Sequence, residues 1–174
     1  MNPHYAEIAG VATVGNLGRV PFVPELVVIA APATAIADVI DEAGNLGAAG
    51  ALIIAAGLGR GADSLAEAAE RAARKYGMRP MGPNCLGIII PGANLNASFS
   101  AHTPGAGNLA LISGSGAIAT GMVDWAAQRG VGFSGIISIG DQLDVDIADL
   151  LDYFALDGKT FLLGIPRPCS RLFK

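Results

Sequence analysis

Small residues with hydroxyl groups fill the segment ISGSGA (112–117), between a predicted strand and a predicted helix. The first main-chain N–H groups of a helix have no partner inside the helix, so an anion can accept hydrogen bonds from them. The candidate phosphate-binding residues are Ser113, Gly114, Ser115 and Gly116. A tight turn with Ser115 as an ordinary N-cap explains the same pattern, and the spacing alone leaves both interpretations open.

Two more loops of small residues follow predicted strands at 26–30 and 51–55. In open α/β sheets, ligands bind outside the carboxyl ends of the strands. The candidate ligand-binding residues here are Pro32, Ala33 and Thr34 in one loop and Ala56 and Gly57 in the other. For either loop taken alone, a tight strand-to-helix turn is the interpretation that the sequence favours.

The most distinctive string is GPNCLG (82–87). The Asn84 side chain can bond a ligand and the main chain at once, because an amide both donates and accepts. Cys85 has no histidine near it in the sequence to act as its base, so a nucleophilic role is not indicated. A second pattern, GVGFSG (130–135), matches the dinucleotide fingerprint by letter only, because it leads from a helix end into a strand.

Apolar runs alternate with longer helical segments, which is typical of βαβ units and a parallel sheet. The strands are predicted at 26–30, 51–55, 79–81, 87–90, 108–112, 133–139 and from 160. The helices are predicted at 34–46, with Thr34 as N-cap, and at 62–76, 117–129 and 145–156. The fully apolar strand at 26–30 is expected in the centre of its sheet.

Composition excludes several classes of protein. The 174 residues are 52% hydrophobic, with a net charge of −4 and no basic stripe, which argues against nucleic acid and anionic membranes as partners. No apolar run is long enough to cross a membrane. The two cysteines, Cys85 and Cys169, form no disulfide framework, so we expect a cytoplasmic protein. His4 and His102 are far apart in sequence, and no metal site is predicted.

Several linked strings resemble the NDP-forming acyl-CoA synthetases, which include the ADP-forming acetyl-CoA synthetases and, more distantly, the succinyl-CoA synthetase α subunit. The strings are PELVVIAAPA (24–33), MGPNCLG (81–87), NLNASF (94–99), LISGSGAIATGMVDWAAQRGVGFS (111–134) and GDQLDVDIADLLDYFALD (140–157). The resemblance implies an α/β fold, with a truncated Rossmann-like CoA-binding unit followed by a truncated flavodoxin-like parallel α/β unit. The expected bounds are 1–106 and 107–164, with a non-family tail at 165–174.

The family reaction converts an acyl-CoA, a nucleoside diphosphate and phosphate into a free acid, CoA and a nucleoside triphosphate through a phosphohistidine. The resemblance implies that coenzyme A or acyl-CoA meets the loops at 32–34 and 56–57. It implies that Asn84 and Cys85 lie near the thiol end of the ligand. It also implies that the turn at 113–116 receives the phosphate of the phosphohistidine.

Departures from the family pattern matter equally. The family's opening strand and glycine-rich CoA loop are expected before Asn2, and its phosphohistidine with a carboxylate partner after Leu163. Neither His4 nor His102 stands in the phosphohistidine context, and no ATP-grasp domain is recognised. We therefore expect a fragment that binds CoA and phosphate, has no catalytic residue of its own and does not complete the reaction alone.

Two alternatives stay open. The chain is a subunit that works with a partner carrying the ATP-grasp domain, or it is a non-enzymatic remnant that assembles into oligomers. A strand at 26–30 with an open flank invites pairing with another chain. We therefore expect a homo-oligomer.

Overall fold

The computed structural model describes residues 1–2, 4–158 and 160–165, so the predicted tail lies outside the described residues except for its first residue. The strands are β1 (Glu7–Ile8), β2 (Val11–Ala12), β3 (Leu26–Ile29), β4 (Gly50–Ile53), β5 (Arg79–Met81), β6 (Gly87–Ile90), β7 (Leu95–Ser98), β8 (Ala106–Ser113), β9 (Phe133–Ser138) and β10 (Phe161–Ile165). The α-helices are α1 (Ile36–Asn45), α2 (Leu65–Lys75), α3 (Gly116–Ala127) and α4 (Ile147–Ala155). Short 3-10 turns are η1 (Leu17–Arg19), η2 (Ala33–Ala35) and η3 (Pro91–Ala93).

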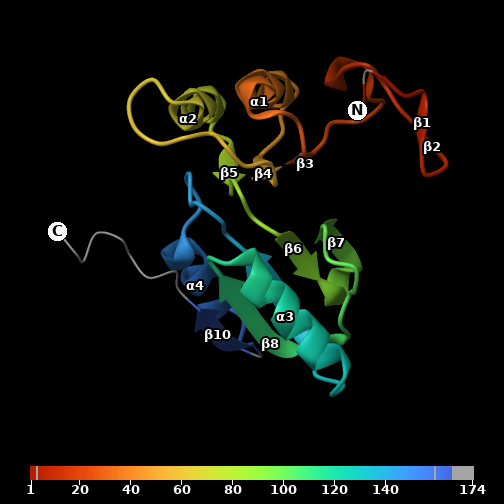
Figure 1. Ribbon diagram of the computed structural model, residues 1–174, viewed down its shortest axis with the longest axis vertical. Coiled ribbons are helices and arrows are strands. Elements are labelled where there is room, and N and C mark those ends of the chain that lie inside the picture. The colour runs from red at the N-terminus through yellow and green to blue at the C-terminus, as the bar shows by residue number, and fades with distance from the viewer. Residues whose placement is uncertain (3, 159, 166–174) are drawn as a thin grey trace.

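The first unit is a three-stranded parallel sheet in the order β3-β4-β5, with α1 and α2 on the same face (Figure 1). Alternate residues of β3 and β4 face the helices and form an aliphatic and alanine-rich core with them. Small alanines on α2, such as Ala69 and Ala73, are fully buried and let that helix lie close to the sheet. This packing holds the carboxyl ends of the strands in register.

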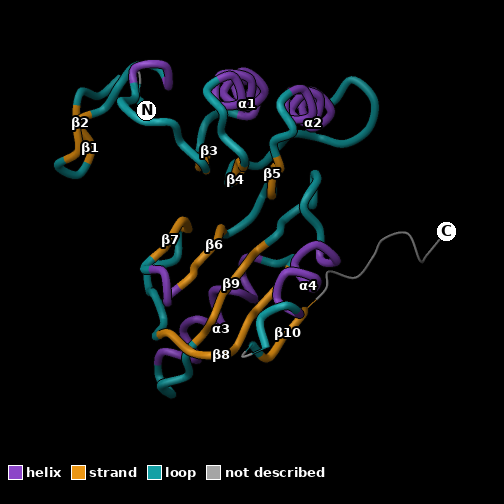
Figure 2. Tube along the Cα trace, turned by 180° about the vertical axis from the view of Figure 1, so that it is seen from behind, coloured by secondary structure: helices purple, strands orange, loops and turns teal. Residues whose placement is uncertain are grey.

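The second unit is a five-stranded sheet in the order β10-β8-β9-β6-β7. β10, β8 and β9 are parallel, whereas β6 and β7 run antiparallel to their neighbours. Helices α3 and α4 lie on opposite faces, as the front and back views show (Figures 1 and 2). Leu111 and Ile136 pack toward α3, while their neighbours Ile112 and Ile137 share a core with Phe154 of α4. The predicted α/β class is confirmed, and the antiparallel hairpin is the part that strand–helix alternation did not predict.

Loops at the carboxyl ends of β5 and β9 join the two units. The loop after β9 donates three main-chain hydrogen bonds to the segment around the end of β5: Asp141 N to Pro83 O at 2.8 Å, Leu143 N to Gly82 O at 2.8 Å, and Val145 N to Pro80 O at 3.2 Å. Beneath them the units share one core, in which Leu52 and Met81 of the small sheet pack with residues of the large one. The carboxyl edges of the parallel strands in both sheets are therefore brought together.

Two local expectations were wrong. The strand β3 is at the edge of its sheet, not at the centre, with β4 as its partner among the described residues. Its outward side chains Leu26 and Val28 are 39% and 48% exposed. Thr34 is not an N-cap, because residues 33–35 form η2 and α1 starts after Ala35 with no side-chain cap. The predicted division at residue 106 stays a prediction, although β6 and β7 already belong to the second sheet.

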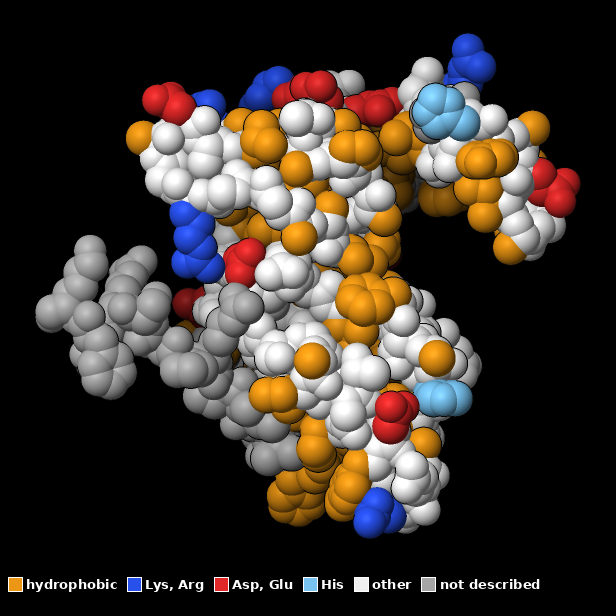
Figure 3. Space-filling view, in the orientation of Figure 1, with side chains coloured by type: hydrophobic (Ala, Val, Ile, Leu, Met, Phe, Trp, Pro, Cys, Tyr) orange, Lys and Arg blue, Asp and Glu red, His pale blue; other side chains and the backbone are white. Residues whose placement is uncertain are grey.

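Charged side chains gather on the outer surface of α1 and α2, at the top of the space-filling view (Figure 3). Ion pairs such as Lys75–Asp41, 2.8 Å apart, lie there at the surface between the two helices. Within the ranges the structure describes, none of the helices combines the length and the apolar character that crossing a membrane requires.

Gly140 offers a test of the junction between the units. It has φ +57°, and a Cβ atom there would lie 2.1 Å from the carbonyl oxygen of Pro83, whereas Gly130, at φ +66°, has nothing within 4 Å. Both alanine variants lose left-handed backbone freedom, worth about 1 kcal/mol, but only Gly140→Ala must also push main chains apart, for a total of about 3 kcal/mol. Urea unfolding of the two variants measures the difference. Equal destabilisation would contradict a close junction at Gly140.

Candidate functional site

Four loops meet where the carboxyl ends of the two sheets face each other. The loop after β4 contacts the loop after β5, since Asn84 N donates to Ala55 O at 2.9 Å. The loop after β5 contacts the end of β9, since Leu86 N donates to Ser138 Oγ at 3.1 Å. Ile139 N in turn donates to Ser113 O at 3.0 Å, which ties in the loop after β8. Candidate residues from separate parts of the sequence are thus brought together at the facing edges of the two sheets. We call this region the crevice.

Asn84 and Cys85 point in opposite directions. Asn84 is exposed in a left-handed conformation with φ +57°, which asparagine tolerates better than most residues. Cys85 is 2% exposed, lies in the core shared by the units and donates from Sγ to Ile53 O at 3.3 Å. Burial raises the pKa of the Cys85 thiol to about 11. Of this pair, only Asn84 presents its side chain at the surface.

The turn at 113–116 is locked by its first hydroxyl. Ser113 is fully buried, and its Oγ accepts a hydrogen bond from Ser115 N at 3.0 Å. Ser115 is the N-cap residue of α3, but its side chain makes no capping hydrogen bond. Gly116 approaches Leu86 so closely that a Cβ atom would lie 3.4 Å from Leu86 Cβ. The start of a twelve-residue helix therefore lies against the GPNCLG loop, and its first main-chain amides have no partner within the helix.

The remaining two predicted loops lie along the edge of the small sheet. β3 and β4 are neighbours, so the loop at 32–34 adjoins the loop at 56–57, and Ile54 N donates to Ile29 O at 3.0 Å. Pro32 and Thr34 are exposed, and Ala33 is half-buried. Ala56 and Gly57 are exposed, and Gly57 has φ +88° with open space where a Cβ would stand. Main chain is therefore accessible in both loops.

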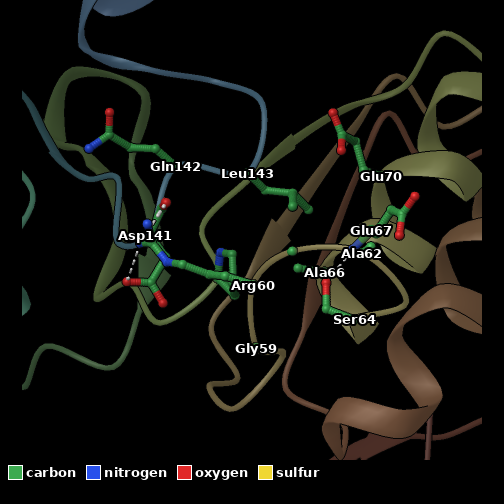
Figure 4. Close-up of a pocket in the computed structure, with 12 residues that line it drawn as sticks. Gly59, Arg60, Ala62, Ser64, Ala66, Glu67, Glu70, Asp141, Gln142 and Leu143 are labelled. Carbon is green, nitrogen blue, oxygen red and sulfur yellow. Dashed lines mark hydrogen bonds and ion pairs between the residues drawn. The ribbon is translucent and has the colours of Figure 1, made fainter. Parts of the chain in front are cut away.

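A hollow of about 530 Å³ opens beside these loops, between the start of α2 and the loop after β9 (Figure 4). Its lining includes Arg60, Asp141, Gln142 and Leu143, none of which the sequence analysis singled out. Arg60 reaches across from the first unit, and its Nη2 lies 3.4 Å from Asp141 O and 3.6 Å from Asp141 Oδ1. Asp141 follows closely after the strand predicted at 133–139, and this position was the signal in the sequence that could have identified it.

The start of α2 is already occupied by its own side chains. Ser64 Oγ accepts a hydrogen bond from Glu67 N at 3.2 Å, and Glu67 Oε2 accepts one from Asp63 N at 2.7 Å. The first bond satisfies one first-turn amide of the helix, and the second holds the Glu67 carboxylate against its positive end. The start of α3 has no such side-chain cap, so no capping side chain occupies its first amides.

No group of three or more His, Cys, Asp or Glu side chains is placed to hold a metal ion anywhere in the described part of the chain.

Two protein families match successive parts of the chain. The CoA binding domain family matches residues 1–91, and the succinyl-CoA ligase like flavodoxin domain family matches residues 106–165. The matched segments follow the order of the two sheets. The loops after β4 and β5 lie in the first matched segment, and the loops after β8 and β9 lie in the second.

Proteins with similar sequences include ADP-forming acetate–CoA ligases. The chain is 34% identical over 168 residues to acetate–CoA ligase [ADP-forming] I of Archaeoglobus fulgidus, which covers 95% of this chain and 24% of the relative. It is 39% identical over 158 residues to the α subunit of acetate–CoA ligase [ADP-forming] II of Pyrococcus furiosus, covering 89% of this chain and 34% of that subunit. The chain thus spans about a quarter to a third of these relatives' length.

A solved structure shows the same arrangement of elements. Acetyl-coenzyme A synthetase 1 of Ca. Korarchaeum cryptofilum, in complex with phosphate and ADP, superposes with a TM-score of 0.85 at 33% sequence identity. The match covers 99% of this chain and 39% of that one. The two units and the junction between them therefore have the same fold in this chain and in that structure.

Burial of Cys85 predicts a slow reaction with alkylating agents. With a pKa near 11, only about one thiol in a thousand is ionised at pH 8, and the sulfur is also shielded. In a Cys169→Ser background we expect iodoacetamide at pH 8 to modify Cys85 at least about a hundredfold more slowly in buffer than in denaturing urea. Mass spectrometry over time measures both rates. Comparable rates would show that the thiol faces the crevice.

Proposed function

The chain belongs to the NDP-forming acyl-CoA synthetase family, and from that premise we propose that its crevice binds coenzyme A together with a phosphate group. The observation that supports this most is the meeting of four small-residue loops at the facing carboxyl ends of two sheets. Parallel sheets bind ligands at that edge. The ligand would lie across the loops at 32–34 and 56–57 and reach Asn84 with its thiol end.

Phosphate would bind at the start of α3. The amides there are aligned by the turn at 113–116, which the Ser113 hydroxyl locks without using the Ser115 side chain. A helix start offers hydrogen-bond donors and a partial positive charge, so no basic side chain is required. The relative solved with phosphate and ADP supports phosphate as a ligand of this family.

Catalysis would need parts that other segments or chains supply. The only histidines are His4, which precedes β1, and His102, in the loop between β7 and β8, and neither belongs to the four loops of the crevice. Named relatives include α subunits, which supports a partner chain as the source of the missing parts. Formation of ATP by the purified chain from acetyl-CoA, ADP and phosphate would contradict this part of the proposal.

Asn84 gives the sharpest test of CoA binding. We expect isothermal titration calorimetry to detect CoA at millimolar concentration or below, and Asn84→Ala to weaken binding about fivefold through the loss of one hydrogen bond. Asn94→Ala is a matched control, because Asn94 is also exposed and left-handed, at φ +53°, but lies in the β6–β7 hairpin. No CoA binding by the unmodified chain at millimolar ligand would reject the proposal.

Ser115 tests the phosphate site separately. Its hydroxyl caps nothing, so Ser115→Ala should weaken inorganic phosphate binding about threefold while leaving the free energy of unfolding nearly unchanged. Asp146→Ala should do the reverse, because it costs about 1 kcal/mol of stability through the lost cap of α4 without affecting phosphate. Phosphate titration by ³¹P NMR and urea unfolding measure the two effects. The same pattern in both variants would place phosphate elsewhere.

A further inference from the structure

Arg60 is the one basic residue, in the part of the chain that the structure describes, that stands at the carboxyl edge of either sheet. It lies in the loop after β4, and residues 54–64 belong to no helix or strand. The other described Lys and Arg residues lie in η1, on α2, at the first position of β5 or just after α3: Arg19, Arg71, Arg74, Lys75, Arg79 and Arg129. Among the described residues, this is the guanidinium that a ligand with phosphate groups would meet in the crevice.

The partner of Arg60 holds it only loosely. The closest carboxylate contact, to Asp141 Oδ1, is 3.6 Å, well beyond the 2.7–2.9 Å of a strong charged hydrogen bond. The side chain of Arg60 is 73% exposed, and exposed ion pairs contribute little free energy. Asp141 itself is anchored through its main chain, since its N–H donates to Pro83 O. Arg60 can therefore leave this contact at small cost while Asp141 stays in place.

The glycines that flank Arg60 leave open space beside it. Gly59 and Gly61 flank it with φ +71° and +92°, and no atom lies within 4 Å of the Cβ position of Gly61. Arg60 also lines the hollow of about 530 Å³ between the two units, and its side chain extends across it toward Asp141 (Figure 4). The guanidinium can thus turn within open space.

Other charges around the hollow are already compensated. Glu67 pairs with Arg71 at 3.4 Å and accepts from Asp63 N, and Glu70 pairs with Arg74. All of these contacts are made within α2 or at its start. The two glutamates therefore do not compete strongly with a ligand for Arg60, and Asp141 is the competitor that matters.

We propose that Arg60 is the side-chain phosphate ligand of the crevice, released by Asp141 and turned onto a phosphate group of the bound molecule. A guanidinium binds phosphate through two parallel charged hydrogen bonds, which the present contact with Asp141 does not offer. The inference rests on the proposed function. The phosphate group belongs either to CoA or to free phosphate, and the chemistry of recognition is the same.

Calorimetry with four probes and four variants tests this. The probes are CoA, dephospho-CoA, pantetheine and inorganic phosphate, and the variants are Arg60→Gln, Arg60→Lys, Asp141→Asn and the control Arg129→Gln. Arg129 is an exposed arginine between the end of α3 and the start of β9, so it lies near the amino end of that strand and not at the carboxyl edge. Urea unfolding of each variant confirms that it is folded before titration.

Arg60→Gln should weaken binding of the phosphate ligand about tenfold, and Arg60→Lys less, because lysine keeps the charge but not the paired geometry. Asp141→Asn should bind as well as the unmodified chain or better, and Arg129→Gln and all pantetheine titrations should be unchanged. A loss confined to CoA against dephospho-CoA assigns the 3′-phosphate. A loss shared by both assigns the diphosphate, and a loss with inorganic phosphate assigns free phosphate.

Two results would overturn the inference while leaving the proposed function intact. One is unchanged binding of every probe by Arg60→Gln in a chain that binds CoA. The other is an equal loss of affinity in Asp141→Asn, which would show that the Arg60–Asp141 pair has a structural role in holding the two loops together. Absence of CoA and phosphate binding by the unmodified chain at millimolar ligand rejects the proposed function and this inference together.

Discussion

Three main-chain hydrogen bonds between the loop after β9 and the end of β5 determine how the two units meet. They run from Asp141, Leu143 and Val145 to the carbonyls of Pro83, Gly82 and Pro80. Such contacts require the two backbones to approach directly, which only a residue without a Cβ permits at Gly140. Because both loops follow strand ends, this junction also brings the carboxyl edges of the two sheets face to face. The crevice is a consequence of the same contacts that join the units.

The junction explains why one loop serves both the core and the surface. In the GPNCLG segment, Cys85 enters the shared core with Leu52 and Met81, while its neighbour Asn84 is turned outward in a left-handed conformation. The buried thiol fixes the loop from below through its bond to Ile53 O. The exposed amide is thereby held at a defined place above it. Cys85 thus contributes to packing, and the adjacent Asn84 is left exposed at the surface.

Strand–helix alternation was enough to predict the main elements from the sequence, because apolar runs such as β3 and β9 are bounded by turn residues. The pairing of β6 with β7 and β9 was not predictable in this way, since antiparallel pairing depends on a turn at η3 and on a distant strand. The edge position of β3 depends on which strands are present to pair with it. Of the site, the strand-end loops follow from local sequence alone, whereas the hydrogen bonds that bring them together join residues far apart in the sequence.

The contact between Arg60 and Asp141 could not be predicted, because it joins residues 81 positions apart through an exposed and irregular loop. The chain has a net charge of −4, which repels an anionic ligand at long range, so a guanidinium that is only weakly paired is useful for binding such a ligand. A tightly bonded, buried pair would have to be broken at high cost before arginine could bind phosphate. An exposed pair at 3.6 Å keeps the guanidinium near the crevice at almost no cost, so nearly all of its attraction for phosphate remains available for binding.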